Sequence, residues 1–412
     1  MDGSTGEREA EGGDGDGRIL DFSTYDADTS GQNGRGSLVT PTKLSLKQAV
    51  LEGLEKTGYR VKDDTIALPS GATKATLRQL HDLAVRKRIA QAEPGLRRHE
   101  TRLLRYIANG QDVVPDKLKP ALTIVEPDSE EELLFRYACL HWSIPVSSGY
   151  GRRLRFLVKD ESNGKLVGLF GLGDPVYALA DRDAWIGWQQ DAKRKNLRYV
   201  MDAYVLGAVP PYSSLLGGKL IALLALSSEV REAFSKKYAG RTSIISNVRD
   251  RGELMMVTTT SALGRSSIYD RLRVEDQTYW HRLGYTQGSG EFQFSNGVYE
   301  AMRAYVIEHC KPTAKSSAWG TGFRNRREVI RKCLASIGLP ASLIYHRIQR
   351  EIFAAPLGPD VRRFLKGEVP TVELYEWPAA ELFSQFRRRW LEGRASRDRR
   401  YLEFERESYR LW

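Results

Sequence analysis

The sequence predicts an α+β protein in which a mixed sheet, covered by helices, lies between two basic helical segments. Three observations support this fold class. Two β-rich apolar runs, 154–158 and 166–172, flank the turn residues Asn163 and Gly164. Apolar residues recur at helical spacing on both sides of this region, and strands alternate with helices from about residue 199 onward. With 412 residues the chain is too long for one core of typical size, so we expect several domains.

The first segment differs from the rest in composition. Residues 1–36 hold nine acidic residues, three arginines and nine glycines, and almost no large apolar side chains. We predict a disordered acidic tail over 1–42, with or without a role in shielding the basic body. The tail carries −6 and the whole chain +11, which leaves +17 (11 + 6) on residues 37–412. Such a charge favours anionic partners, DNA first, although many basic enzymes bind no DNA.

Residues 43–115 read as a helical N-terminal domain. Apolar faces repeat at three- and four-residue steps over 44–54, 77–89 and 96–107. A Pro-Gly pair at residue 94 separates the last two helices, and Asn-Gly at residue 109 ends the third. Their outer faces are rich in arginine. The three predicted helices form either a small DNA-docking module or a helical cap whose arginines are solvated.

Residues 116–298 form the predicted α/β core. Its two opening runs make an antiparallel hairpin around Asn163 and Gly164. The later elements expected in chain order are a strand at 199–206, a long helix at 214–238, a strand at 254–259, a short helix at 266–272 and a closing hairpin at 285–294.

Residues 299–412 form a basic and mainly helical C-terminal region with two candidate sites for nucleic acid. The first is a Gly-rich turn that leads into an arginine-rich helix. The second is the segment 385–412, where nine arginines are interleaved with aromatic residues, a composition that suits stacked bases and phosphates. Amphipathic helices with solvated arginines would give the same pattern. The candidate contacts are Arg324, Arg326, Arg327, Arg331, Arg387, Arg388 and Arg389.

Several classes of protein are disfavoured. The densest apolar run, 215–226, is interrupted by two glycines and a lysine and is too short for a bilayer, so no membrane contact is expected. Three widely spaced cysteines exclude a disulfide framework and indicate a reducing, cytoplasmic location. Six scattered histidines lack ligand spacing, so no metal site is predicted.

The turn after the strand 199–206 is the sharpest local feature. A strand that passes through a tight turn into a helix leaves backbone N–H groups unpaired at the helix start, and these suit a phosphate. The turn contains neither GxGxxG nor the P-loop pattern, so the cofactor stays unknown. Close packing of helix on sheet is the alternative role of its glycines. The candidate binding residues are Tyr212, Ser213, Ser214, Gly217, Gly218 and Lys219.

The order of elements in the core resembles the acyl-CoA-binding N-acetyltransferase fold. This resemblance implies that Val209–Lys219 holds the cofactor pyrophosphate, that Tyr269 is the acid, and that Asp202 lies on the strand that often carries the base. The Arg/Gln-x-x-Gly-x-Gly/Ala pattern of that family is absent, and Pro210 and Pro211 stand in its approach. Whether the chain is an enzyme is left open.

The segment Asp181-Arg182-Asp183 has two interpretations. Two carboxylates around an arginine, with Trp185 and Trp188 nearby, provide either a base with an orienting cation or metal ligands. A buried ion pair that locks a loop produces the same pattern.

Several longer motifs of the chain resemble those of one protein family. They begin at Phe135-Arg-Tyr, Trp142-Ser-Ile-Pro-Val-Ser and Gly149-Tyr-Gly-Arg-Arg-Leu-Arg-Phe, and continue through Gly207–Leu220, Thr258–Tyr269 and Gly322-Phe-Arg-Asn-Arg. The chain thereby resembles the DruA family of the bacterial Druantia anti-phage defence systems over roughly 44–395. The resemblance implies a role in defence beside a helicase-like partner and assigns no catalytic residue. We expect the protein to bind or help process phage nucleic acid; the alternative is an acyl-CoA- or nucleotide-dependent transferase.

Overall fold

The computed structural model describes residues 41–62, 65–147, 151–242, 249–274, 277–295, 297–313, 319 and 323–412. The tail predicted over 1–42 lies outside these residues except for its last two.

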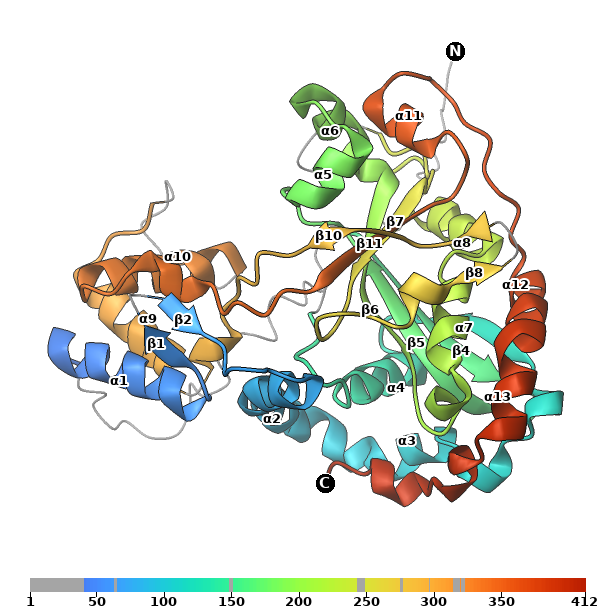
Figure 1. The fold of residues 1–412 in the computed structure, drawn as a ribbon, viewed down its shortest axis with the longest axis horizontal. Helices are drawn as coiled ribbons and strands as arrows, with labels where there is room; N and C mark the ends of the chain where they lie inside the picture. Colours follow the sequence, from blue (N-terminus) through green and yellow to red (C-terminus); the bar gives the residue numbers. More distant parts are fainter. Residues whose placement is uncertain are drawn as a thin grey trace, which may run out of the picture.

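A mixed seven-stranded sheet forms the centre of the molecule (Figure 1). Its strand order is β10-β11-β7-β6-β5-β4-β3, and neighbours are antiparallel except for the parallel pair β6–β7. The α+β class with a mixed sheet is thus confirmed. The strands are β3 (Pro120–Ile124), β4 (Arg153–Asp160), β5 (Lys165–Gly173), β6 (Val200–Ala208), β7 (Met256–Thr260), β10 (His281–Tyr285) and β11 (Glu351–Pro356), with separate hairpins β1 (Arg60–Lys62)–β2 (Thr65–Ala67) and β8 (Arg273–Val274)–β9 (Gln277–Thr278).

Helices surround this sheet. Within the described ranges none is long and apolar enough to cross a bilayer, and no three His, Cys, Asp or Glu side chains there are grouped to hold a metal ion. The α-helices are α1 (Lys43–Lys56), α2 (Lys74–Leu96), α3 (Glu100–Leu103), α4 (Glu130–Cys139), α5 (Ala180–Ile186), α6 (Gln190–Asn196), α7 (Gly217–Leu224), α8 (Ser228–Tyr238), α9 (Val298–His309), α10 (Phe323–Ser336), α11 (Val361–Lys366), α12 (Ala379–Phe386) and α13 (Glu392–Arg397).

The hairpin β4–β5 forms where the Asn-Gly signal predicts it. Gly164 adopts a φ of 71°, which a glycine reaches without strain, and the strands pair from Arg153–Gly173 to Asp160–Lys165. Along β4, Phe156 and Leu157 alternate between two separate apolar clusters. The sheet is therefore buried on both faces.

The two faces have different covers. One carries α7, α8 and α12, whose apolar residues join Phe156, Phe170 and Phe353 in a single core. The opposite face carries α3, α4 and the C-terminal residues around Tyr409, packed on Leu157 and Leu169.

A second lobe stands beside the sheet (Figure 1) and is built from two distant parts of the chain. Helix α1 and the β1–β2 hairpin share a core with α9 and α10, and Gly53 of α1 lies against Val298 of α9. The lobe therefore joins segments that the sequence division assigned to the N-terminal domain and the C-terminal region.

The expected long helix at 214–238 is two helices. Helix α7 ends at Leu224, and α8 begins at Ser228. The Ser228 amide donates to the Trp377 carbonyl at 2.9 Å, and the Trp377 amide donates to Ser228 Oγ at 3.0 Å. Because these long-range bonds fix the Ser228 backbone to a segment near α12, the helix breaks there.

The expected closing hairpin at 285–294 is also wrong. Strand β10 ends at Tyr285 and pairs with β11, which inserts between β10 and β7, while Phe292–Phe294 form a 3-10 turn. Strand β11 lies in the region expected to be mainly helical. Its short apolar run does not distinguish a buried strand from a helix segment.

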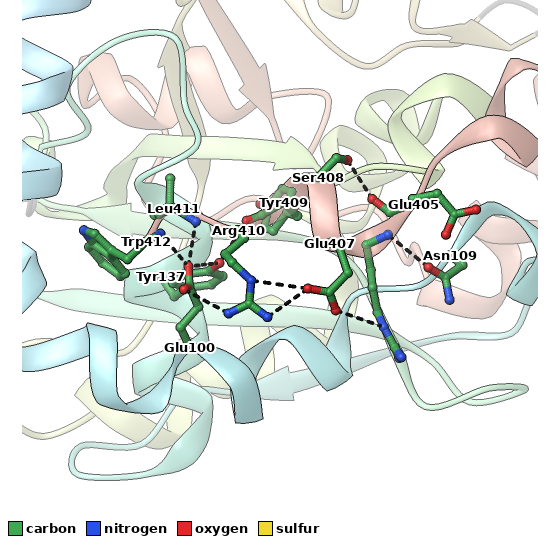
Figure 2. A network of polar contacts seen from close by, with 11 residues as sticks. Glu100, Asn109, Tyr137, Glu405, Glu407, Ser408, Tyr409, Arg410, Leu411 and Trp412 are labelled. Carbon is green, nitrogen blue, oxygen red and sulfur yellow. Dashed lines mark hydrogen bonds and ion pairs between the residues drawn. The ribbon is translucent and has the colours of Figure 1, made fainter.

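The C-terminal residues are anchored by one buried carboxylate (Figure 2). Glu100 is 2% exposed and accepts hydrogen bonds from the amides of Leu411 and Trp412 at 2.6 and 3.2 Å. The Tyr137 hydroxyl donates to it at 2.9 Å, and Arg410 Nη1 lies 3.4 Å from Glu100 Oε2. One side chain thus joins the chain end to α3 and α4.

Glu100→Ala should lower the free energy of unfolding by about 1–3 kcal/mol, because it leaves buried donors without an acceptor. Glu407→Ala is the matched control, since Glu407 pairs with the same Arg410 at 2.8 Å but is 63% exposed. It should cost less than about 1 kcal/mol. Urea unfolding of the full chain measures both, and equal effects would contradict the anchoring role.

Candidate functional site

The strands β6 and β7 form a fork. They pair from Val200–Met256 to Ala203–Thr259; beyond this point β6 continues only beside β5, and β7 ends at Thr260. The Thr259 hydroxyl donates to the Ala203 carbonyl at 2.8 Å, at the last pair before the strands part. Ligands of open α/β sheets bind beyond the carboxyl ends of such strands. The fork is therefore the part of this sheet where a ligand or catalytic site is expected.

The two candidate catalytic residues both lie at this fork. Thr258 Oγ1 donates to Asp202 Oδ1 at 2.9 Å, and burial raises the pKa of Asp202. Tyr269 is 5% exposed in a 3-10 turn after β7 and is hydrogen-bonded to the Thr259 side chain. Burial raises the pKa of Tyr269 to about 12, so the phenol keeps its proton at neutral pH. The arrangement brings a carboxyl group from β6 and a proton donor from the 3-10 turn to neighbouring residues of β7, Thr258 and Thr259.

Arg350 is a third member of this cluster that the sequence did not indicate. It precedes β11, donates to the carbonyls of Ser261 and Thr260, and acts electrostatically on both Asp202 and Tyr269. Burial lowers the pKa of Arg350, and the charge of Asp202 opposes that shift. No spacing signal could have found Arg350, because β11 was not predicted.

Glu351 positions the segment that carries Tyr269. It is fully buried and accepts a hydrogen bond from the Ser266 amide at 2.6 Å, while its own amide donates to Ser261 Oγ at 2.9 Å. The loop from Ser261 to Tyr269 is therefore held against β11.

The predicted phosphate turn contacts the chain's own groups. A Cβ on Gly217 would lie 2.7 Å from the Tyr212 carbonyl oxygen, and one on Gly218 would lie 3.1 Å from Ile268 Cδ1. These distances favour the packing role of the two glycines. An apolar gap lies beside the turn, lined by Leu118, Val167, Tyr212, Leu215, Gly217, Leu220, Phe386 and Leu391.

The other residues of this turn also have partners. The Tyr212 hydroxyl donates to Asp160 Oδ2 at 3.0 Å, and the Ser214 carbonyl accepts from Arg394 Nε at 2.9 Å. Ser213 donates its amide to the Val209 carbonyl. Lys219 Nζ donates to the Ile268 carbonyl at 3.0 Å and lies 5.4 Å from the Trp390 ring centroid, and burial lowers its pKa to about 8.

The segment Asp181-Arg182-Asp183 locks a loop. Arg182 is fully buried, its Nη2 lies 2.7 Å from Asp183 Oδ1, and its guanidinium donates to the carbonyls of Val176 and Tyr177. Lys193 Nζ donates to the other Asp183 oxygen at 2.6 Å. These contacts favour the interpretation in which a buried ion pair locks the loop.

The predicted nucleic-acid contacts on α10 differ in their surroundings. Arg326 Nε pairs with Glu291 Oε2 at 3.1 Å and its guanidinium covers the Tyr299 ring, and Arg327 donates to Ser289 Oγ at 3.0 Å. Arg331 is exposed on the same helix. The side chain of Arg324 and the Gly-rich turn around Gly322 lie outside the described residues.

The other predicted contacts, Arg387, Arg388 and Arg389, lie in a π-helical turn, Arg387–Leu391, between α12 and α13. Arg387 donates to the carbonyls of Leu118 and Asp116 at 2.9 and 3.3 Å, which ties the turn to the start of β3. Arg388 and Arg389 are exposed, and no carboxylate of the described ranges pairs with either. Single π turns inside helices are rare overall, but those that occur often lie at functional sites.

The fold and this turn define an α+β protein that displays exposed arginines on a structured helix. Comparison with known proteins then identifies the family. The family model described as "Druantia protein DruA" matches residues 71–367. A protein named "Druantia protein DruA" from Escherichia coli (strain UMEA 4076-1) is 38% identical over 373 residues, which cover 90% of each chain. The chain therefore belongs to the DruA family, whose members are components of Druantia anti-phage defence. No solved structure matches it significantly.

Gly217→Val should prevent folding or lower the free energy of unfolding by about 1–3 kcal/mol, because the new side chain would overlap the Tyr212 carbonyl. Gly393→Val is the control, since its Cβ would meet nothing closer than Arg397 Nη2 at 3.6 Å. Thermal unfolding and a plaque assay measure both variants. A folded Gly217→Val protein without phage protection would instead favour a ligand site.

Proposed function

We propose that this chain is the nucleic-acid-binding component of a cytoplasmic Druantia defence system and acts on phage DNA beside a helicase-like partner. The π turn at Arg387–Leu391 is the observation that carries the proposal. It presents Arg388 and Arg389 to solvent, while Arg387 fixes the turn to the segment just before β3. A guanidinium pairs with phosphate through two parallel hydrogen bonds, and this turn offers two such groups on a backbone that is already ordered.

The charge balance supports the same function. Residues 37–412 carry +17, and exposed Lys117 lies next to the π turn, one residue after the Asp116 carbonyl that Arg387 contacts. Each phosphate that the protein neutralises releases counterions, so the affinity for DNA should fall steeply with salt. The three cysteines are free, which suits a reducing compartment.

Acyl transfer is the second candidate function. The pairing of Asp202 with Thr258 and of Tyr269 with Thr259 at the β6–β7 fork favours it. The start of α7, where the acyltransferase resemblance implies a pyrophosphate, instead contacts the Tyr212 carbonyl and the Ile268 side chain. We therefore rank it below nucleic-acid binding.

The double variant Arg388→Gln/Arg389→Gln should weaken DNA binding and reduce the slope of log affinity against log salt by about 2, because two phosphate contacts are lost. Fluorescence anisotropy over a salt series measures this. Lys236→Gln is the control, since Lys236 is also exposed but lies on another helix, α8. A DNA affinity that the double variant leaves unchanged, or that ignores salt, would rule the proposal out.

Tyr269→Phe separates the two candidate functions. The phenyl ring keeps its packing against Trp280 and Phe353, whose ring centroids lie 5.2 and 4.9 Å away, so the protein should fold. We expect normal phage protection in a plaque assay. Loss of protection by a folded variant would favour acyl transfer, because general acid catalysis is typically worth about 10²–10⁴-fold in rate.

A further inference from the structure

Two exposed aromatic rings lie beside the sheet edge formed by β10. Tyr177 is 49% exposed in the loop before α5, and Tyr285 is 44% exposed at the end of β10; Val176 beside them is 41% exposed. Helix α5 packs against β10, as Figure 1 shows. We call this region the α5 surface and define it by Tyr177, Lys193, Arg282, Tyr285 and Arg362.

Consecutive residues of α5 hold the backbones of both tyrosines in place. The buried Arg182 donates to the Tyr177 carbonyl at 3.0 Å, and Asp181 Oδ2 accepts from the Tyr285 amide at 2.7 Å. The backbones that carry the two rings are therefore fixed to one helix. A ligand that stacks on these rings orders only their side-chain torsions, which limits the entropy cost of binding.

Cations surround the rings. Lys193 Nζ lies 4.3 Å from the Tyr177 ring centroid, and the Arg362 guanidinium lies 4.4 Å from the ring centroid of Trp185. Arg282 on β10 pairs with the buried Glu351 at 3.4 Å, and its side chain is still 51% exposed. Two further exposed cations on α6 are Arg194 and Lys195.

Most of the nearby carboxylates are already engaged. Asp183 is bonded to Arg182 and Lys193, and Asp181 accepts from the Tyr285 amide. The buried Glu351 accepts from the Ser266 amide and pairs with Arg282. Asp191 of α6 is exposed, but the exposed cations named above outnumber it, and they are interleaved with flat apolar rings.

We propose that the α5 surface binds single-stranded nucleic acid, with bases stacked on Tyr177 and Tyr285 and phosphates paired with Arg282 and Arg362. The inference rests on the proposed nucleic-acid binding and specifies the form of strand. A duplex hides the faces of its bases, so exposed rings gain nothing from it, whereas every unpaired base has a face to stack.

Fluorescence anisotropy with a labelled oligothymidine strand tests the inference on the full-length protein. Tyr177→Ala/Tyr285→Ala should weaken binding at least about fivefold for each ring removed. Tyr177→Phe/Tyr285→Phe should bind as the parent does, because the rings remain. An abasic strand of equal length should bind the parent more weakly than oligothymidine, and the alanine changes should not affect its binding.

Controls separate this inference from the proposed function. Ile307→Ala removes an apolar side chain of similar exposure, 48%, from the other lobe and should change nothing. The alanine pair should leave duplex binding intact, since that depends on Arg388 and Arg389. Unchanged oligothymidine affinity in a folded alanine variant, or equal affinity for the abasic strand, would overturn the α5 surface alone. Failure of the parent to bind any nucleic acid at low salt would overturn the proposed function as well.

Discussion

The parallel contact between β6 and β7 is the constraint on which the other parts depend. Four residue pairs, from Val200–Met256 to Ala203–Thr259, join the antiparallel strands β3–β6 to the β7–β11–β10 half of the sheet. Parallel neighbours require a crossover, which α7 and α8 provide on one face. The same register places Asp202 beside Thr258 and ends the pairing one residue later. The fork and its buried polar cluster are thus consequences of one short pairing.

Local signals in the sequence predicted the parts of the fold that depend on neighbouring residues. The Asn163-Gly164 turn identified β4–β5, and apolar runs identified β6 and β7 within two residues of their ends. The failures described above, at 214–238 and 285–294, involve distant partners. Strand β11 pairs with residues almost a hundred positions earlier, at Phe353–Thr259, and the break between α7 and α8 depends on Trp377. Single-sequence periodicity carries no information about such pairings.

The candidate sites show the same division. Asp202 and Tyr269 were found because each lies on a locally predictable element, and the structure brings both to β7; Arg350 was missed because its element was missed. The arginines were recognised as a group, but their environments differ. Arg326 and Arg387 bond to the chain itself, while Arg388 and Arg389 face solvent. Residue type alone does not report that difference, since it arises from tertiary packing.

The shared core of the second lobe has a consequence for synthesis on the ribosome. Helix α1 emerges well before α9, yet its apolar residues Val50 and Leu54 pack with Met302 and Val306 of α9. Until that later helix has been made, the apolar face of α1 stays uncovered and accessible to chaperones or to other nascent chains. A nascent chain that stops before α9 would therefore expose this face.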